Sequence, residues 1–256
     1  MKIHFIGIDG VGMSFLAKLC EDFADVDGSD IKRKGHKAEF VAGADLVEKS
    51  MAITDDNPEI VEAKKEGLPI VDRASLLGVI MDSYGKKIAV SGTHGKTTAT
   101  AMIAYALRSL EPTAAIGGSI GGKVGIVGKK KVFVAEACEY KRSFLHLNPT
   151  IGVILNADFD HVDYYRSLSD VQSAFREFAD KCETALIGED IKRFGIKGRK
   201  QTLIFGFTDD CDYVGKIDND ILFLLRNGVV KDSVRLKVRG KHNYYDALAA
   251  LAGAGF

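Results

Sequence analysis

The stretch "IAVSGTHGKTTATAM" (88–102) constrains the fold of this chain most, because it joins a β-like run to a helix through a glycine loop. A strand is predicted over 88–91 and a helix from Thr97 to Leu110. The loop between them reads G-x-x-G-K-T from Gly92 to Thr97. The longer pattern G-x-x-x-x-G-K-[ST] fails here, since Val90 occupies its first glycine position.

A strand, a glycine loop and a helix in this order form the geometry that holds a phosphate group. Backbone amides converge on the anion, glycine allows close approach, and the helix dipole favours negative charge. We expect Lys96 to reach the β- and γ-phosphates of a nucleotide and Thr97 to bind Mg²⁺. A glycine turn with a good helix cap is the alternative interpretation. The residues expected to bind the nucleotide here are Gly92, Thr93, His94, Gly95, Lys96, Thr97 and Thr98.

Alternating β and α patterns before this loop predict an N-terminal α/β domain. Strands are expected near residues 2–8, 25–27, 46–53 and 68–71, with helices up to Cys20 and over 31–41, 57–66 and 73–81. This order implies a Rossmann-like parallel sheet with helices on both faces. The polar stretch "DSYGKK" (82–87) breaks the pattern, so we assign residues 1–84 and 85–256 to two domains.

The second domain is expected to be a central P-loop α/β ATPase domain. Further strands are predicted over 131–137, 150–156, 184–188 and 202–207, and a helix over about 169–181. Residues 211–239 alternate like antiparallel strands, and a final helix covers 242–256.

Two of these strands end in oxygen ligands. Glu136 lies at the end of one strand and Glu139 follows it; the other strand leads into Asn156, Asp158, Asp160, His161 and Asp163. Ligands of parallel sheets gather at the carboxyl edge, and oxygen donors suit Mg²⁺. Read alone, the acidic loop is typical of a solvated turn, but beside a phosphate loop we favour a metal site. His4, His36 and His146 are expected to be structural.

A second glycine turn follows the first strand. Its glycines fall at Gly7, Gly10 and Gly12, and Asp9 occupies the second glycine position of the dinucleotide pattern G-x-G-x-x-G. The turn therefore argues poorly for NAD but suits a phosphate, with amides of residues 10–13 at a helix N-terminus. Asp30 lies ~20 residues on, where an acid can bind a ribose or related hydroxyl. Two phosphate sites on two domains indicate a two-substrate enzyme.

Charge and cysteine content narrow the function classes. Thirty-five basic residues balance thirty-five acidic ones, which argues against nucleic acid or a membrane surface as a partner. The four cysteines form no C-x-x-C pair, which fits a reducing cytosol. No window reaches the ~18 apolar residues of a membrane span, so a cytoplasmic protein is expected.

Taken together, five ordered motifs resemble the Mur ligase family, in particular its UDP-N-acetylmuramate–L-alanine ligases. The motifs are "GIDGVGMS…GSD…DNPE", "SGTHGKTTATA", "EACEYKRSFLHLNP", "ILNADFDHVDYY" and "GKHNYYDALAALA". The resemblance covers essentially the whole chain. It implies ATP-dependent joining of L-alanine to UDP-N-acetylmuramate through an acyl phosphate, in cytoplasmic peptidoglycan synthesis, with Mg²⁺.

The resemblance also implies roles for particular residues. Lys96 would contact the β/γ-phosphates, Thr97 and Glu136 would bind one Mg²⁺, and His161 would bind a second metal near the acyl phosphate. His242, Asn243 and Asp246 would lie by the adenine. The UDP-sugar pocket would be lined by Gly10, Val11, Gly12, Met13, Ser14, Asp30, Ser50 and Ala52.

The chain departs from the family pattern in three places: the segment "EDFADVDGSD" lacks the glycine usual between the first helix and the second strand, and the other two concern the adenine site and the third domain. Asp246 stands where the family has asparagine, and an ionised aspartate only accepts hydrogen bonds, so adenine recognition is in question. The family also continues into a third domain that binds the amino acid, whereas this sequence stops at Phe256. We therefore expect a piece of a longer ligase, inactive alone, for which the third domain would be a partner.

Other functions stay open from sequence. A murein peptide ligase of the Mpl type is the nearest alternative, and a folylpolyglutamate synthase is opposed by the UDP-sugar motifs. A non-catalytic UDP-sugar or nucleotide sensor fits the absent domain but not the complete set of Lys96, Thr97, Glu136 and His161. An NAD dehydrogenase is opposed by the glycine spacing.

Overall fold

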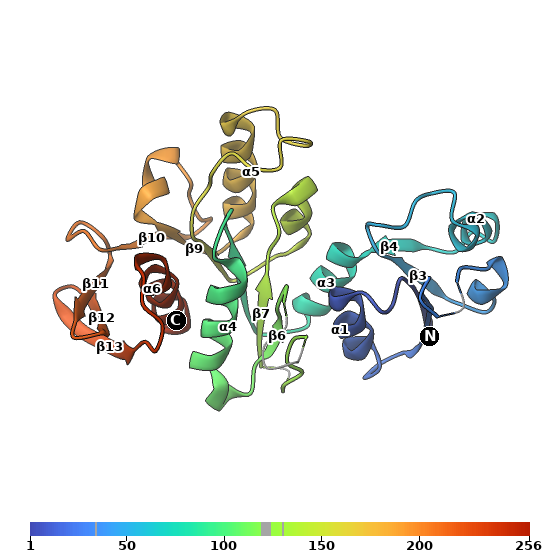
Figure 1. Ribbon diagram of the computed structural model, residues 1–256, viewed down its shortest axis with the longest axis horizontal. Coiled ribbons are helices and arrows are strands. Elements are labelled where there is room, and N and C mark those ends of the chain that lie inside the picture. The colour runs from blue at the N-terminus through green and yellow to red at the C-terminus, as the bar shows by residue number, and fades with distance from the viewer. Residues whose placement is uncertain (34, 119–123, 130) are drawn as a thin grey trace.

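The computed structural model describes residues 1–33, 35–118, 124–129 and 131–256, and it contains two separate β-sheets. Figure 1 shows them side by side in an elongated molecule, with α3 (Arg73–Asp82) between them. The described helices cannot span a membrane, because none is both long enough and apolar enough.

The N-terminal sheet is parallel throughout, with the strand order β2-β1-β3-β4. Its strands are β1 (Lys2–Ile6), β2 (Asp25–Ser29), β3 (Leu46–Lys49) and β4 (Ile70–Asp72). Alternate residues of β1 face opposite layers, as strand geometry requires. Phe5 packs in the cluster with α1 (Val11–Cys20) and α3, whereas Ile6 packs in the cluster with α2 (Pro58–Lys65). Helices therefore cover both faces, as predicted.

One predicted helix is wrong. Residues 31–41 form turns and a short 3-10 helix, η1 (Ala38–Val41), apart from residue 34, which lies outside the described part. Gly35 has φ +70°, and the Asp30 side chain accepts a hydrogen bond from the Lys32 amide at 3.0 Å. Local side-chain capping of this kind competes with helix formation.

The larger sheet has nine strands in the order β13-β12-β11-β10-β9-β8-β5-β7-β6. The strands are β5 (Lys86–Ser91), β6 (Thr113–Ala115), β7 (Val132–Glu136), β8 (Ile151–Ile154), β9 (Thr184–Gly188), β10 (Gln201–Gly206), β11 (Tyr213–Asp218), β12 (Ile221–Arg226) and β13 (Val229–Arg235). All neighbouring strands between β11 and β6 in this order pair in parallel, whereas the β11–β12 and β12–β13 pairs are antiparallel. The predicted antiparallel region is confirmed, but sequence patterning missed the three-residue strand β6.

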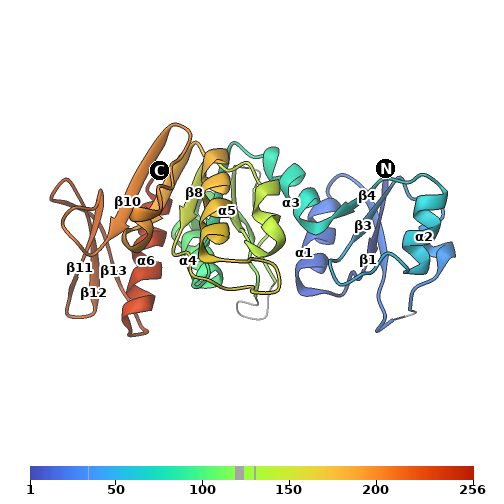
Figure 2. The same ribbon diagram turned by 90° about the horizontal axis from the view of Figure 1, so that it is seen from above.

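Helices cover both faces of the larger sheet (Figure 2). One face buries α4 (Lys96–Ala106) and α6 (Lys241–Ala254); the other buries α5 (Leu168–Lys181) and η3 (Tyr140–His146). The remaining short helices are η2 (Arg108–Leu110) and η4 (Glu189–Phe194). The α5 face shares one continuous hydrophobic cluster with α1 and α3, so the two sheets are joined through a common apolar layer.

Strand β5 lies between β7 and β8, and this placement builds the candidate site. Val90 pairs with Glu136 of β7, and Ser91 pairs with Ile154 of β8. The carboxyl ends of the three strands therefore meet at one edge, directly below the glycine loop that follows β5.

Candidate active site

The loop between β5 and α4 has a backbone that requires its glycines. Gly92 has φ +147° and Gly95 has φ +84°, conformations that side chains other than glycine rarely adopt. A Cβ at Gly92 would also lie 3.0 Å from the Cβ of Leu155. The loop is thus a tight turn that opens a helix with no side-chain cap, as a phosphate loop does.

Lys96 points back into this loop. Its Nζ donates to the carbonyl oxygens of Gly92 at 2.6 Å and Thr93 at 3.1 Å, and to Glu139 Oε1 at 3.1 Å. Glu139 is only 2% exposed, and its Oε2 has no hydrogen-bond partner of good geometry although Lys96 Nζ lies 3.0 Å away. The ammonium group is therefore held at the loop by a buried carboxylate that retains accepting capacity.

Thr97 and Glu136 form a second polar pair at the same edge. Thr97 Oγ1 donates to Glu136 Oε2 at 2.8 Å, and the Gly117 amide donates to the same oxygen at 2.8 Å. A hydroxyl and a carboxylate this close together are the hard oxygen donors that Mg²⁺ prefers. The residues present thus fit the predicted magnesium ion.

His161 lies beside the Lys96–Glu139 pair rather than the Thr97–Glu136 pair. Its Nε2 lies 3.3 Å from Glu139 Oε1, and its ring packs against Tyr140 with centroids 4.8 Å apart. Lys96 and His161 therefore converge on Glu139, which makes that carboxylate the centre of the polar cluster. His161 has the left-handed φ of +52°, which is uncommon for residues other than glycine.

Side chains of the acidic loop after β8 form hydrogen bonds to the phosphate loop and to η3. Asn156 Oδ1 accepts from the His94 amide at 2.8 Å, and its Nδ2 donates to the His94 carbonyl at 3.0 Å. Asp163 accepts a hydrogen bond from the Tyr140 hydroxyl at 2.7 Å. Within the described ranges no three His, Cys, Asp or Glu side chains cluster as a metal site would require. The magnesium site stays a prediction, with the Thr97 hydroxyl and the adjacent Glu136 carboxylate as its candidate ligands.

Of the three residues expected by the adenine, Asp246 lies against the phosphate loop. A Cβ at Gly95 would lie 2.5 Å from Asp246 Oδ1. Burial raises the pKa of Asp246 to about 7. His242 is exposed and Asn243 half-buried at the start of α6, where Asn243 Nδ2 donates to the Arg239 carbonyl at 2.8 Å. Their contact with adenine stays a prediction.

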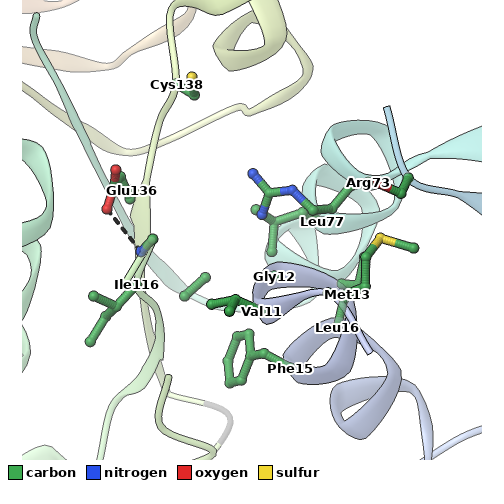
Figure 3. A pocket seen from close by; sticks show the side chains of 14 residues that line it. Val11, Gly12, Met13, Phe15, Leu16, Arg73, Leu77, Ile116, Glu136 and Cys138 are labelled. Carbon is green, nitrogen blue, oxygen red and sulfur yellow. Dashed lines mark hydrogen bonds between the residues drawn. The ribbon is translucent and has the colours of Figure 1, made fainter. Parts of the chain in front are cut away.

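A pocket of about 310 Å³ joins the two halves of the site (Figure 3). One side is the glycine turn and first turn of α1, the second is α3, and the third is the end of β6 and β7 with Glu136. Among the predicted sugar-binding residues, those that line it are Gly10, Val11, Gly12, Met13 and Ser50. The glycine turn of the first sheet and the Glu136 carboxylate of the second thus open into one space.

The other three predicted sugar-binding residues lie elsewhere. Ser14 lines a neighbouring pocket of about 690 Å³ together with Lys18 and Gly125. Asp30 accepts hydrogen bonds from the amides of Asp9 at 3.2 Å and Lys32 at 3.0 Å, so it orders the turn. Ala52 is not among the residues that line either pocket.

Sequence reasoning missed two polar residues of the main pocket, Arg73 and Cys138. Both lie close behind a parallel strand: Arg73 follows β4 directly, and Cys138 lies two residues after β7. Position at the carboxyl edge was therefore the signal that could have found them. Burial raises the pKa of the Cys138 thiol above its usual value.

Comparison with known proteins gives this arrangement a family. Residues 2–84 match the model described as "Mur ligase family, catalytic domain", and residues 90–254 match "Mur ligase middle domain". A UDP-N-acetylmuramate–L-alanine ligase of Caldanaerobacter subterraneus is 41% identical over 98% of this chain and 62% of its own length. This chain thus spans about 62% of that relative.

Solved structures agree with the sequence match. UDP-N-acetylmuramate–alanine ligase from Thermotoga maritima superimposes with a TM-score of 0.81 at 31% identity, covering 98% of this chain and 64% of that one. A UDP-N-acetylmuramate:L-alanyl-γ-D-glutamyl-meso-diaminopimelate ligase from Neisseria superimposes with a TM-score of 0.85 at 22% identity, covering 99% and 93%. The second likeness shows the fold alone. Two matching family models and these relatives together establish that the chain belongs to the Mur ligase family.

Proposed function

We propose that this chain forms the UDP-sugar-binding and ATP-binding parts of a ligase that joins L-alanine to UDP-N-acetylmuramate in peptidoglycan synthesis. The observation that carries the proposal is the pocket that brings the glycine turn of α1 and Glu136 into one space. A nucleotide sugar on the turn would extend toward the phosphate loop. The 41% identity to an alanine ligase favours this reading over a murein peptide ligase.

The proposed nucleotide site is the loop from Gly92 to Thr98 with Lys96 as its cation. ATP bound there with Mg²⁺ would supply the phosphoryl group that activates the sugar's carboxylate. Lys96 would balance charge on the β- and γ-phosphates, and a fixed cation in a partly buried site stabilises developing charge well. Glu139 holds the ammonium group of Lys96 at the loop.

The proposed metal ligands are Thr97 and Glu136 for one Mg²⁺, and His161 for a second metal. Glu136 faces the sugar pocket as well as Thr97, so a cation held there would lie between the two substrates. Glu139 supports His161 in the same way as it supports Lys96. These contacts would orient the reacting groups, which is the main contribution that a protein makes to phosphoryl transfer.

The proposed sugar site comprises the amides of Gly10–Met13 and the Ser50 side chain, with Asp30 ordering the turn. We assign it to a domain of residues 1–84 and the nucleotide site to a domain of residues 85–256. The described structure keeps all four cysteines free. Free thiols and nucleotide substrates both suit a cytoplasmic enzyme.

The proposal is tested by thermal-shift titration with UDP-N-acetylmuramate and, separately, with Mg²⁺-ATP. A ligand at about 100 times its Kd stabilises the folded state by about 2.7 kcal/mol. Lys96→Ala should abolish the shift with Mg²⁺-ATP and keep the shift with UDP-N-acetylmuramate. Lys216→Ala, an exposed lysine paired with Asp209, is the control and should keep both. A folded wild-type protein that responds to neither ligand would refute the proposal.

A further inference from the structure

Arg73 is the cationic side chain of the pocket that the family motifs do not explain. It is the first residue of α3, where the Asp72 side chain caps the Ser75 amide at 2.8 Å. Figure 3 shows the guanidinium extending from α3 into the pocket, above the first turn of α1 and toward the strand that carries Glu136. Its position is therefore fixed by the helix start, while its charge faces the pocket.

Gly12 makes room for this arginine. A Cβ at residue 12 would lie 3.2 Å from both Cδ and Nη1 of Arg73, closer than side chains normally pack. Gly12 has no left-handed φ, so its backbone does not require glycine. Glycine at this position therefore leaves room for the guanidinium.

The charge of Arg73 is not balanced within the protein. Across the described ranges no carboxylate lies within 4.0 Å of its guanidinium, and no side-chain hydrogen bond to it is found. Glu48 is the nearby acid, but it is fully buried and both its oxygens lack hydrogen-bond partners. Burial raises the pKa of Glu48 to about 8, although the charge of Arg73 lowers it, so this carboxyl is a weak counter-ion for the guanidinium. The guanidinium of Arg73 therefore has no close ion-pair partner among the described residues, and the Glu136 carboxylate is the acidic side chain that lines the same pocket.

The neighbouring first turn of α1 offers a second source of positive potential. Gly10 caps this helix without a side chain, the first turn carries no acid, and the amides of Val11 and Gly12 have no backbone acceptor in the described structure. Two free amides, a helix dipole and a guanidinium converge on one space. A guanidinium binds phosphate oxygens in a forked geometry, and two adjacent anionic groups would use both sources.

We propose that Arg73 binds the diphosphate of the nucleotide sugar, beside the amides of the α1 turn. This inference rests on the proposed function, because it assigns a residue to the UDP-sugar in that pocket. The guanidinium neutralises one phosphate, and the amides of Val11 and Gly12 receive the other. Lysine at position 73 would keep the charge but lose the fork, so it should restore binding only in part.

Calorimetric titration of wild type and Arg73→Gln with UDP, UDP-N-acetylglucosamine, UDP-N-acetylmuramate and uridine tests this inference. Loss of one charge-assisted contact should weaken binding of all three diphosphates by about 10- to 100-fold. Uridine binding should not change. Arg73→Lys should lie between the two, and Arg108→Gln, a surface arginine packed over Tyr105, is the matched control.

The alternative outcomes are distinguishable. A loss confined to UDP-N-acetylmuramate would show that Arg73 binds the lactoyl carboxylate, and equal affinities of wild type and Arg73→Gln would show no anion contact. Either result overturns the inference while the proposed function stands. Wild-type protein that binds none of the diphosphates would instead refute the proposed function. An unchanged thermal shift with Mg²⁺-ATP shows that each variant is folded, and should Arg73→Gln not fold, the comparison of Arg73→Lys with wild type decides.

Discussion

At the scale of single residues, two buried carboxyl groups next to the phosphate loop determine the charge and the side-chain positions of the candidate site. Glu139 is the clearest case, because one buried carboxylate positions both Lys96 and His161. Asp246 is the second, because its carboxyl lies against the phosphate loop and the residue is only 6% exposed. A negative charge at that point opposes the phosphates that the loop is expected to hold.

We predict that Asp246→Asn binds Mg²⁺-ATP more tightly than wild type above pH 7. Ionised Asp246 adds repulsion of ~1 kcal/mol at the loop, a factor of about five in Kd. Wild-type affinity should fall as pH rises from 6 to 8, since the pKa lies near 7, while the variant's affinity should change less. Titration calorimetry at both pH values measures this, with the exposed Asp209→Asn as control. Parallel pH profiles of wild type and variant would contradict the prediction.

The raised pKa of Asp246 also determines how the free energy of unfolding changes with pH. The folded-state pKa is raised from 3.8 to about 7, so the folded protein holds this proton more tightly than the unfolded chain. The contribution of Asp246 to folding is therefore fully present below pH 4 and is lost between pH 4 and 7. Urea denaturation above pH 7 should accordingly find Asp246→Asn more stable than wild type.

Which residues could be recognised from sequence depended on motif spacing. Gly92, Lys96 and Thr97 could be placed because strand, loop and helix follow one another locally. Arg73 could not be, because its partner surface, the turn at Gly12, lies about sixty residues earlier and meets it only through the sheet order. Contacts between segments that are far apart in the sequence produce no local residue pattern from which they could be predicted.

At the scale of secondary-structure elements, α2 is attached to the N-terminal sheet through a buried polar network. Glu59, in its first turn, is fully buried and accepts hydrogen bonds from His4 at 2.7 Å, Ser29 at 2.8 Å and His36 at 2.8 Å. His4 Nδ1 lies 2.6 Å from Asp27. His4 and His36, expected to be structural, therefore link β1, β2 and α2.

We predict that Glu59→Gln lowers the free energy of unfolding by about 3 kcal/mol, because it removes a buried carboxylate from several charge-assisted bonds. Glu62→Gln, one turn along the same helix, is the matched control and should cost under about 0.5 kcal/mol, since its pair with Lys65 is exposed. Urea denaturation measures both. Equal losses for the two variants would contradict a special role for Glu59.

The network around Glu59 also makes the free energy of unfolding depend on pH in a defined direction. Burial alone would lower the pKa of His4, but hydrogen bonds to Glu59 and Asp27 raise it above 6.5 overall. Its stabilisation is therefore fully present below pH 6.5 and is lost as pH rises through the higher folded-state pKa. In Glu59→Gln the pKa of His4 should fall, which NMR titration of the histidine ring detects.

Elements with strong periodicity could be predicted, and those shaped by tertiary contacts could not. The helix at α5 has an apolar face at helical spacing and a Ser167 cap, and its predicted bounds agree with Leu168–Lys181 within one residue at the start. Strand β6 has three residues and exists because it pairs with β7. The helix predicted over 31–41 does not form, because the hydrogen bond from the Lys32 amide to the Asp30 side chain outweighs the helix propensity of the segment.

At the scale of the whole molecule, the two sheets share one apolar layer, and α3 is the element between them. Gly78 of α3 lies so close to η3 that a Cβ would overlap the carbonyl oxygen of His146. The candidate pocket depends on this close approach, because α3 and the β7 edge form two of its walls. The division into domains at residue 84 stays a prediction, and the apolar layer sets how tightly the two parts would be coupled.

We predict that the wild type unfolds in one transition and that Gly78→Ala destabilises the protein by about 2 kcal/mol and unfolds in two, because the added methyl forces α3 away from η3. Gly85→Ala is the matched control: nothing lies within 4 Å of its Cβ position and its φ is not left-handed, so its transition should match wild type. Differential scanning calorimetry measures both variants. Because α3 forms a wall of the pocket, Gly78→Ala should also bind UDP-N-acetylmuramate more weakly while keeping its Mg²⁺-ATP affinity. A single transition with unchanged affinity for the sugar would show that the parts do not depend on this contact.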